Sequence, residues 1–322
     1  MDRRVIVAQP HGFCSGVARA LALAEQTLEQ NGDRMYCLHE IVHNEQVIRD
    51  LAARGMRFVD RVEDVPPGAT LLFPAHGIAP AVRALAQTRG LRTVDATCPY
   101  VTRLHEEVQR FAADGLTVVC IGHRGHDEVI GVVGEAPDQT VVVENEEEAR
   151  AVGVPDPARV AAVTQTTIRP ETAAGILTVL KARFHLLRQP AATNVCHATR
   201  NRQDAVRLLA ERTELVLVLG SANSSNSLRL VETARAAGAR ACLVSARGGL
   251  PIADLVNVRV AGLTSGASTP ESFLEETLAD LRALGFATVE TLCTVKTPQQ
   301  RGESRQARSG RSTPPRTLGE KV

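Results

Sequence analysis

The chain has 322 residues, of which 44% are hydrophobic, and a formal net charge of +1. This length is typical of two or three domains, and the hydrophobic fraction is high enough to build a substantial core. A net charge this close to zero disfavours a nucleic-acid-binding protein, because those proteins carry a marked excess of lysine and arginine.

The charge and the apolar residues are unevenly distributed along the chain. Residues 296–322 contain seven Lys and Arg against two Glu and almost no apolar residues, so we predict a disordered basic tail there. No apolar run approaches the length of a membrane span, and the first residues do not resemble a signal peptide. We therefore expect a cytoplasmic protein without membrane contact, in which the seven cysteines stay reduced.

Common motifs for zinc and for nucleotides are missing from the sequence. It contains no CxxC pair, no GxGxxG after a strand and no GxxxxGK[ST] loop. These absences disfavour a zinc finger, a thioredoxin-type site and the usual nucleotide-binding loops.

Strand-like and helix-like segments alternate along the chain, which is typical of α/β domains with largely parallel sheets. The apolar run 5–8 is followed by Cys14 and an alanine-rich helix, and a similar order recurs around Cys98 and Cys196. A basic residue follows each cysteine by about one turn: Arg19, Arg103, and Arg200 or Arg202. We predict three similar α/β domains, at residues 1–95, 96–193 and 194–295.

Each predicted domain contains two further strand-to-helix transitions with polar loops. The first set is HEIVHN, GHRGHDEV and GSANSSNS, and the second is PAHGIAP, TQTTIRP and TSGASTP. Ligands of open α/β sheets bind beyond the carboxyl ends of the strands, where such loops lie. Three units around a pseudo-threefold axis would therefore bring three cysteines and six polar loops to one centre.

Three converging cysteines suit an iron–sulfur cluster that keeps one iron open for substrate. The start of a helix would also favour the thiolate form of each cysteine. Zinc bound by three cysteines and a histidine is an alternative, and buried structural cysteines are another. The remaining cysteines lie in or at the end of strand-like runs and are predicted to serve packing only: Cys37, Cys120, Cys242 and Cys293.

The serine- and asparagine-rich loops favour a phosphate site, since hydroxyls and amides add to the N–H groups of helix starts. The candidate donors are Ser221, Asn223, Ser224, Ser225, Asn226 and Ser227, then Thr264, Ser265 and Ser268. His43 and His76 add donors that can carry charge. Taken singly, each loop is better explained as a helix cap or a turn, but the convergence of six loops reverses that preference.

Glu128 is a carboxylate within a histidine-rich loop, so it is a candidate proton donor that Thr166 or Thr167 could orient. The alternative is a solvated residue in the first turn of a helix, which is the role we expect for Asp127.

Nine short motifs in register resemble the 4-hydroxy-3-methylbut-2-enyl diphosphate reductase family, from about residue 5 to residue 270. They are GFCSGV, HEIVHN, AHG, DATCPYV, GHRGHDEV, TQTT, NRQ, GSANSSNS and GASTP. The resemblance implies a trefoil of three α/β domains around a [4Fe–4S] cluster. It also implies reductive removal of the allylic hydroxyl of (E)-4-hydroxy-3-methylbut-2-enyl diphosphate by two electrons. The products would be isopentenyl and dimethylallyl diphosphate, at the last step of the non-mevalonate isoprenoid pathway.

The same resemblance implies roles for individual residues. Cys14, Cys98 and Cys196 would ligate three irons, and the fourth iron would take the substrate oxygen. The diphosphate would be held, without Mg²⁺, by His43, His76, Ser224, Ser225, Asn226 and Ser268. His126 and Glu128 would lie beside the substrate, with Glu128 delivering a proton and Thr166 supporting its carboxyl group. An external ferredoxin or flavodoxin, with its reductase, would supply the electrons.

Two features depart from the family pattern, and two other functions stay open. His197 follows Cys196 where the family pattern has tyrosine, and the basic tail is not part of that pattern. One alternative function is a cluster-containing enzyme for another allylic phosphorylated compound, which the phosphate loops disfavour. The other is a non-enzymatic iron–sulfur sensor, in which Glu128 and the threonine loop would be superfluous.

Overall fold

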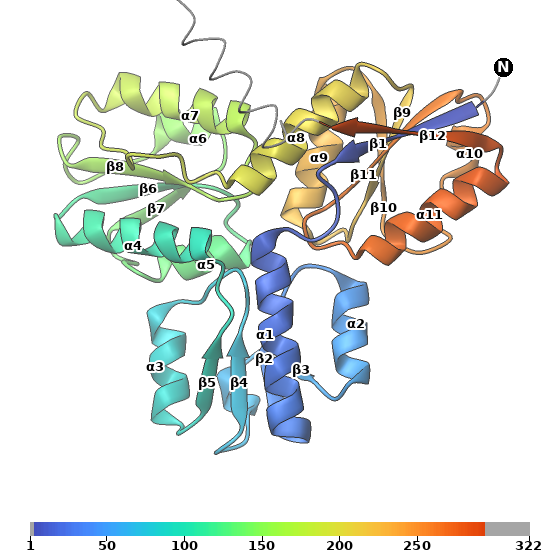
Figure 1. Cartoon of the computed structure of the whole chain (residues 1–322). Coiled ribbons are helices and arrows are strands. Elements are labelled where there is room, and N and C mark those ends of the chain that lie inside the picture. Colours follow the sequence, from blue (N-terminus) through green and yellow to red (C-terminus); the bar gives the residue numbers. More distant parts are fainter. Residues whose placement is uncertain (1–2, 294–322) are drawn as a thin grey trace, which may run out of the picture.

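The computed structural model describes residues 3–293, and the predicted basic tail lies outside them. Three α/β units meet at one point (Figure 1), and the strand pairs within each unit are parallel. The predicted fold class, three similar α/β units in a trefoil, is confirmed.

Each unit is built on its own sheet. The first sheet has the order β3-β2-β4-β5, with β2 Met35–Leu38, β3 Arg57–Val59, β4 Thr70–Phe73 and β5 Arg92–Asp95. The second has the order β7-β6-β8, with β6 Thr117–Ile121, β7 Thr140–Val143 and β8 Val160–Thr164. The third has the order β10-β9-β11-β1-β12, with β1 Arg3–Gln9, β9 Leu215–Leu219, β10 Arg240–Val244, β11 Val260–Ser265 and β12 Phe286–Cys293.

The three sheets repeat one strand order. β4, β8 and β11 occupy the same place in their sheets, and β5 and β1 pair with the first and last of these. In the second sheet the equivalent place is held by a single bridge between Ala161 and Arg188. The strands predicted before Cys14 and Cys98 are therefore present, whereas the strand predicted before Cys196 is reduced to this bridge.

Strand β1 connects the beginning of the chain to the third unit. It pairs with β11 on one side and β12 on the other, so hydrogen bonding assigns it to the third sheet although it is first in sequence. The helix that follows it packs on the first unit, through Ala20, Ala24 and Leu28. The predicted domain bounds stay a prediction, to which the structure adds that residues 3–9 pair with the third unit.

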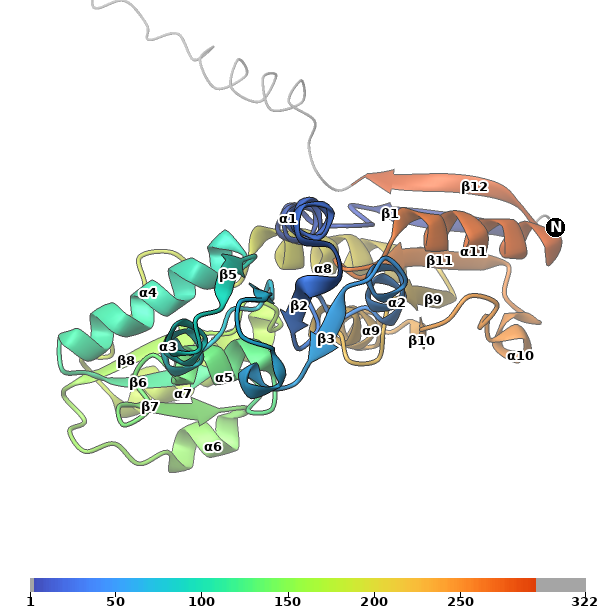
Figure 2. The same cartoon turned by 90° about the horizontal axis from the view of Figure 1, so that it is seen from below.

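Helices cover the sheets (Figures 1 and 2). The first unit has α1 Ser15–Asn31, α2 Glu45–Ala53 and α3 Pro80–Thr88, with short 3₁₀ turns at Gly32–Arg34 and Val62–Asp64. The second has α4 Pro99–Ala113, α5 Asp127–Val133, α6 Glu146–Ala151 and α7 Pro170–Arg183. The third has α8 His197–Ala210, α9 Ser225–Ala236, α10 Ile252–Leu255 and α11 Glu271–Ala283. Within residues 3–293, no helix combines the length and the apolar character needed to cross a membrane.

The central strands are almost entirely apolar because both faces of a parallel sheet are covered by helices. All residues of β2, β4, β8 and β9 are buried. Cys37 and Cys120 are fully buried in strands and Cys242 is half-buried, as their predicted packing role requires. The same prediction is wrong for Cys293, which is exposed at the end of the edge strand β12.

The packing of strand β1 in the hydrophobic core of the third unit can be tested by substitution. Ile6 is 1% exposed and belongs to one hydrophobic cluster with Leu209 and Val218. We expect Ile6→Ala to lower the free energy of unfolding by about 2–5 kcal/mol, because it leaves a cavity in a close-packed core. Denaturant titration measures this change, with Leu186→Ala, at a 67% exposed position, as the control. Equal midpoints for the two variants would contradict the assignment of β1 to this core.

Candidate active site

The three predicted cluster cysteines stand at the beginnings of three helices. Cys14, Cys98 and Cys196 are the N-cap residues of α1, α4 and α8. These helices radiate from the point where the units meet (Figure 1). The Cys14 thiol accepts a hydrogen bond from the Val17 N–H at 3.4 Å, and the Cys196 thiol accepts one from the Thr199 N–H at 3.3 Å.

A backbone hydrogen bond recurs at each cysteine. The N–H of Cys98 donates to the Ala75 carbonyl (2.9 Å), that of Cys196 to the Thr166 carbonyl (3.1 Å), and that of Cys14 to the Ala267 carbonyl (3.0 Å). Each acceptor is the second residue after a strand, following β4, β8 and β11 respectively. The threefold repeat inferred from sequence is therefore present in the backbone of the site itself.

The two glycines near Cys14 have separate structural reasons. Gly12 has φ +70°, a left-handed conformation in the turn between β1 and Cys14 that favours glycine. Gly16 lies against the other cysteines: a Cβ atom there would stand 2.6 Å from the Cys98 Sγ atom and 3.8 Å from the Cys14 Sγ atom. Only glycine leaves the space between these two thiols free.

The expectation that the helix starts would favour thiolates is not supported for the protein without a metal. Burial is the largest influence on Cys98 and Cys196, and it raises the pKa of both thiols above the ordinary value. Hydrogen bonds from backbone N–H groups act in the opposite direction and are weaker. Without a bound metal, these two thiols therefore keep their protons at neutral pH.

Every residue predicted for the site lines one cavity at the centre of the trefoil. The lining includes the three cysteines, three histidines, a carboxyl group and the hydroxyls and amide of the polar loops. These are Cys14, Cys98, Cys196, His43, His76, His126, Glu128, Thr166, Ser224, Ser225, Asn226 and Ser268. The structure brings the predicted residues together, while their individual roles stay predictions.

Glu128 is a buried carboxyl group held at both oxygens. It is 3% exposed, and its two oxygens accept hydrogen bonds from the N–H and the hydroxyl of Thr166, each 2.6 Å long. Burial raises the pKa of Glu128, and the Thr166 hydrogen bonds oppose that rise. His126 caps the same helix, with its Nδ1 atom accepting from the Glu128 N–H at 3.1 Å. The proton of neutral His126 is therefore on Nε2.

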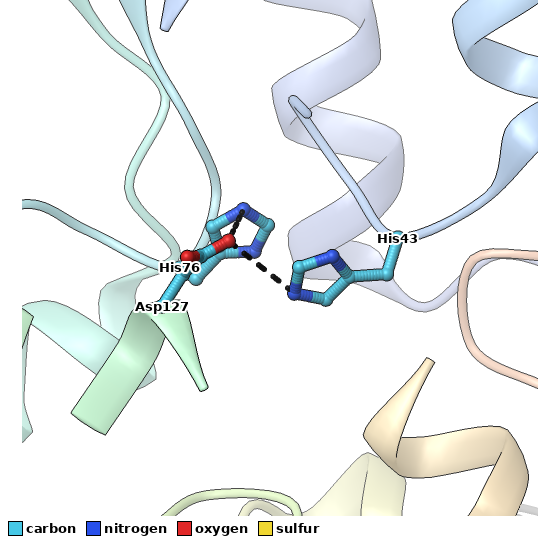
Figure 3. A group of neighbouring side chains, drawn as sticks. All are labelled: His43, His76 and Asp127. Atoms are coloured by element: carbon cyan, nitrogen blue, oxygen red, sulfur yellow. Dashed lines mark ion pairs between the residues drawn. The ribbon is translucent and has the colours of Figure 1, made fainter. Parts of the chain in front are cut away.

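Asp127 is not the solvated residue that we expected. Its Oδ1 atom lies 3.6 Å from His39 Nδ1, and its Oδ2 atom lies 3.8 Å from His76 Nε2 and 4.0 Å from His43 Nε2. Figure 3 shows the Asp127 carboxylate with ion pairs to both His43 and His76, whose rings are stacked with their centroids 4.2 Å apart. Contact with His39 is the main cause that lowers the pKa of Asp127 to about 2.

The buried histidines are neutral in the ligand-free protein. Burial, together with the proximity of His43, lowers the pKa of His76 to about 3 and that of His126 to about 4. His76, which we expected to be a donor that can carry charge, is therefore uncharged in the ligand-free protein. A bound polyanion would favour the charged forms, because an opposite charge nearby raises the pKa of a histidine.

Glu40 was not singled out from the sequence, although it lies within HEIVHN. Its carboxylate contacts His43 Nδ1 (3.3 Å) and accepts a hydrogen bond from the Asn223 side-chain amide (2.7 Å). Its backbone carbonyl is 2.8 Å from His76 Nε2. Glu40 thus fixes both histidines and also ties the first unit to the third.

The polar loops of the third unit divide into two groups. Ser224, Ser225, Asn226 and Ser268 line the cavity, whereas Thr264 and Ser265 belong to strand β11 and are fully buried. Both side-chain polar atoms of Asn226 and the Nε2 atom of His43 are buried without a hydrogen-bond partner among the described residues. Unpartnered buried polar atoms at a cavity indicate a ligand that pairs with them.

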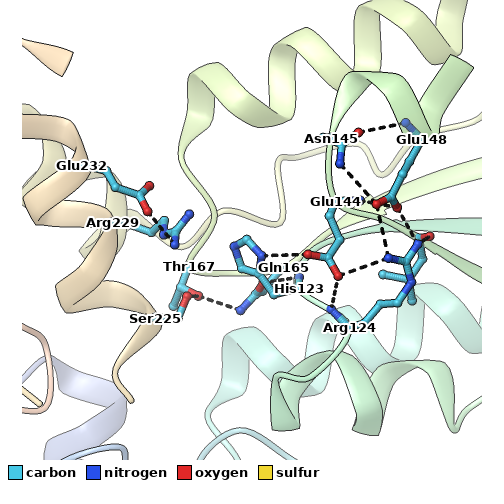
Figure 4. Close-up of polar contacts among 11 residues, drawn as sticks. His123, Arg124, Glu144, Asn145, Glu148, Gln165, Thr167, Ser225, Arg229 and Glu232 are labelled. Carbon is cyan, nitrogen blue, oxygen red and sulfur yellow. Dashed lines mark hydrogen bonds and ion pairs between the residues drawn. The ribbon is translucent and has the colours of Figure 1, made fainter. Parts of the chain in front are cut away.

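A polar network fixes the loops after β6 and β8 (Figure 4). The Gln165 side chain accepts from the His123 N–H at 3.1 Å and donates to the Thr167 hydroxyl at 3.0 Å. The Thr167 hydroxyl in turn contacts the Ser225 hydroxyl of the third unit at 3.0 Å. These hydrogen bonds set the loop that carries Thr166 against the loop that carries Ser225.

Three cysteines and a buried carboxyl group around one polar cavity, at the centre of three α/β units, define a site suited to metal-dependent chemistry on an anionic substrate. Residues 5–282 match the family model described as "LytB protein". The chain therefore belongs to the LytB family, whose members are iron–sulfur oxidoreductases of isoprenoid biosynthesis.

Similar proteins bear one name. A 4-hydroxy-3-methylbut-2-enyl diphosphate reductase of Bordetella pertussis is 46% identical over 291 residues, which is 90% of each chain. One of Mycolicibacterium gilvum is 45% identical over 293 residues, which covers 91% of this chain and 88% of the relative.

Solved structures agree with the sequence comparisons. The E-1-hydroxy-2-methyl-but-2-enyl-4-diphosphate reductase from Plasmodium falciparum is similar with a TM-score of 0.88 and 33% identity, over 96% of this chain and all of that one. A second structure, described as the terminal enzyme of the non-mevalonate pathway, has a TM-score of 0.62 and 30% identity over 87% of this chain and 99% of that one.

The histidine cluster predicts a distinctive titration. Without ligand, His76 and His126 should stay neutral from pH 8 to pH 5, whereas Asp127 raises the pKa of His39 so that this ring titrates above its usual value of about 6.5. In the unfolded chain His76 takes up a proton near pH 6.5, whereas in the folded protein it does so near pH 3. The free energy of unfolding should therefore fall as the pH drops below 6.5, because the unfolded chain binds the extra proton. NMR of the ring protons measures the midpoints, and Asp127→Asn should lower that of His39. A midpoint near 6.5 for His76 would contradict the structure.

Proposed function

We propose that this chain is a 4-hydroxy-3-methylbut-2-enyl diphosphate reductase. The reaction takes (E)-4-hydroxy-3-methylbut-2-enyl diphosphate, two electrons and two protons to isopentenyl or dimethylallyl diphosphate and one water. The observation that carries this proposal is the buried Glu128–Thr166 pair in one cavity with three cysteines and an unpartnered Asn226. An acid, a metal site and an anion site are the three elements that the reaction requires.

The cysteines fit a [4Fe–4S] cluster better than a single ion. Four ligands of one zinc ion lie roughly 3–4 Å apart, as zinc–ligand distances of about 2.0–2.3 Å dictate. Among the described residues, three possible metal ligands lie within 4.8 Å of one another only in the group of His43, His76 and Asp127. The three cysteine thiols do not form such a group, so they are too widely spaced for one ion. Because residue 16 is glycine, the space beside two of the thiols is free of side-chain atoms. This space suits a group larger than a single ion.

Cys14, Cys98 and Cys196 would therefore hold the cluster. When bound, the cluster would supply electrons singly and a Lewis-acidic iron that lacks a protein ligand. The helix starts beneath the cysteines direct the positive ends of three helix dipoles toward this bound group.

The diphosphate would bind on the side of the cavity formed by the polar loops. Its donors would be His43, His76, Ser224, Ser225, Asn226 and Ser268. Ser268 already donates to the His43 carbonyl at 2.9 Å, so the first and third units approach each other at this site. Since these donors come from two units, the diphosphate would bridge the first unit and the third. The histidine, hydroxyl and amide donors would hold it without Mg²⁺.

Glu128 would supply the proton with which the allylic hydroxyl leaves as water. Its raised pKa favours the protonated carboxyl, and Thr166 holds both oxygens in a fixed orientation. His126 presents its Nε2 proton beside Glu128 and would position the substrate hydroxyl. The second proton goes to carbon and decides which of the two products forms.

The reaction also requires an external reductant. Two electrons must enter for each substrate, and the sequence has no flavin or nicotinamide loop. An external one-electron donor, ferredoxin or flavodoxin with its reductase, in the cytoplasm completes the proposal. The other allylic compound and the sensor considered above are less favoured, because the cavity combines a diphosphate-type donor set with a buried acid.

Substitution of the proposed acid tests this function. Glu128→Gln should lower kcat by about 10²–10⁴-fold, because it removes a general acid, while iron and sulfide contents stay unchanged. The wild-type rate should fall as the pH rises and Glu128 loses its proton, and this fall should be absent from the variant. Turnover of the substrate with a chemical reductant measures both effects.

The matched control is Glu29→Gln, at an exposed position of α1, which should keep full activity. Unchanged turnover in Glu128→Gln would remove Glu128 from the mechanism and favour the sensor.

A further inference from the structure

Three exposed aromatic side chains accompany the three cysteines. Phe13 directly precedes Cys14, Tyr100 is the second residue after Cys98, and His197 directly follows Cys196. Phe13 is 38% exposed, Tyr100 is 37% exposed, and His197 is exposed as well. Scattered exposed apolar side chains need no explanation, but here one lies beside each cysteine.

Tyr100 and His197 lie at the boundary between the central cavity and solvent. Both line the cavity and both are exposed. Their rings have centroids 5.1 Å apart, and the Tyr100 hydroxyl is in hydrogen-bond contact with His197 Nδ1. This contact joins the first turn of α4 to the first turn of α8, so the two rings form one surface over the cysteines.

An exposed arginine also follows each cysteine in the sequence. Arg19, Arg103 and Arg200 follow the three cysteines by about one helical turn, and all three are exposed. Arg19 donates to the Thr97 carbonyl beside Cys98 at 3.1 Å, so it lies across the boundary between two units. Arg103 and Arg200 have no ion pair with the part of the chain that the structure describes.

The same helices keep acidic residues away from the centre. The first turns of α1, α4 and α8 contain no acidic residue. The first acids along these helices are Glu25, Glu106 and Asp204, each further from the cysteine than the arginine. After each cysteine, the first arginine, lysine or acidic residue of the helix is therefore an arginine.

We propose that Phe13, Tyr100 and His197, with Arg19, Arg103 and Arg200 around them, form the docking surface for an acidic one-electron carrier protein. This docking surface rests on the proposed function, since it serves a cluster on the three cysteines. The arginines recognise acidic side chains of the carrier, and the aromatic residues supply the apolar contact nearest the cluster.

The electrons balance over two encounters. In each, one reduced carrier loses one electron and the cluster gains it, and the oxidised carrier then leaves. Two electrons and two protons remove the hydroxyl of one substrate as water. A carrier that must leave twice per turnover requires a weak complex, and electron-transfer contacts are among the smallest protein interfaces.

Three exposed arginines on the helices that carry a small aromatic surface meet these requirements. Complementary charge accelerates encounter without making the complex tight, and its effect falls as salt screens the charges. The first step of cluster reduction should therefore be fast at low salt and slow at high salt when the donor is an acidic protein.

The test compares a protein donor with a small donor, using the cluster-loaded protein under anaerobic conditions. Stopped-flow absorption follows cluster reduction by a reduced, acidic [2Fe–2S] ferredoxin and, separately, by reduced methyl viologen. The test variant is the double substitution Arg103→Glu and Arg200→Glu. The control is Arg34→Glu with Arg282→Glu, at two exposed arginines beyond the last turn of α1 and in the last turn of α11.

We expect the test variant to be reduced by ferredoxin at least tenfold more slowly than the wild type, with little remaining salt dependence. Its reduction by methyl viologen and its iron content should match those of the wild type within about twofold. The double substitution Arg103→Lys and Arg200→Lys keeps the charge and should keep the ferredoxin rate.

Each other outcome has a distinct meaning. Equal ferredoxin rates in the wild type and the Glu variant, or an equal loss in the control, would overturn the docking surface and leave the proposed function intact. A wild-type protein that carries no cluster, or whose cluster methyl viologen does not reduce, would overturn the proposed function and the docking surface with it.

Discussion

The structure depends on one repeated hydrogen bond, from the backbone N–H of each cysteine to a carbonyl two residues after a strand. Each bond fixes the start of a helix to the end of a neighbouring parallel strand, so the backbone of the sheets positions the cysteines. Gly16 then keeps the space between two thiols free. The proposed metal site thus rests on backbone geometry, and in the proposed function the other side chains of the cavity bind the substrate and deliver protons.

Charge in the cavity is organised around neutral histidines and two acids with opposite tendencies. Asp127 contacts three histidines and holds its negative charge, whereas burial favours the protonated form of Glu128, the next residue in the chain. A polyanionic substrate near His76 would favour protonation of that ring and so strengthen its own binding. The site therefore avoids a permanently cationic cavity, which would be costly to bury, and still offers charge to a diphosphate.

The sequence predicted the repeat, the helix starts at Cys14, Cys98 and Cys196, and the residues that line the cavity, because strand-to-helix loops of parallel sheets converge at one edge. It did not predict that β1 pairs with the third sheet, since pairing between segments some 250 residues apart leaves no local pattern. Asp127 was misjudged because first-turn acids are usually solvated, and the three histidines around it come from other loops. Thr264 and Ser265 look like loop residues by composition alone, yet β11 extends through them.

The most direct test of this account is the metal content of anaerobically prepared protein, with Gly16→Ala and Gly153→Ala as a matched pair; a Cβ at Gly153 would meet no atom within 4 Å. The account predicts about four irons and four sulfides per chain in the wild type and in Gly153→Ala. It also predicts an absorption spectrum that shifts when 4-hydroxy-3-methylbut-2-enyl diphosphate is added, and a marked loss of iron in Gly16→Ala. Stoichiometric zinc, or no metal in the wild type, would contradict the central claim that the three cysteines hold an iron–sulfur cluster.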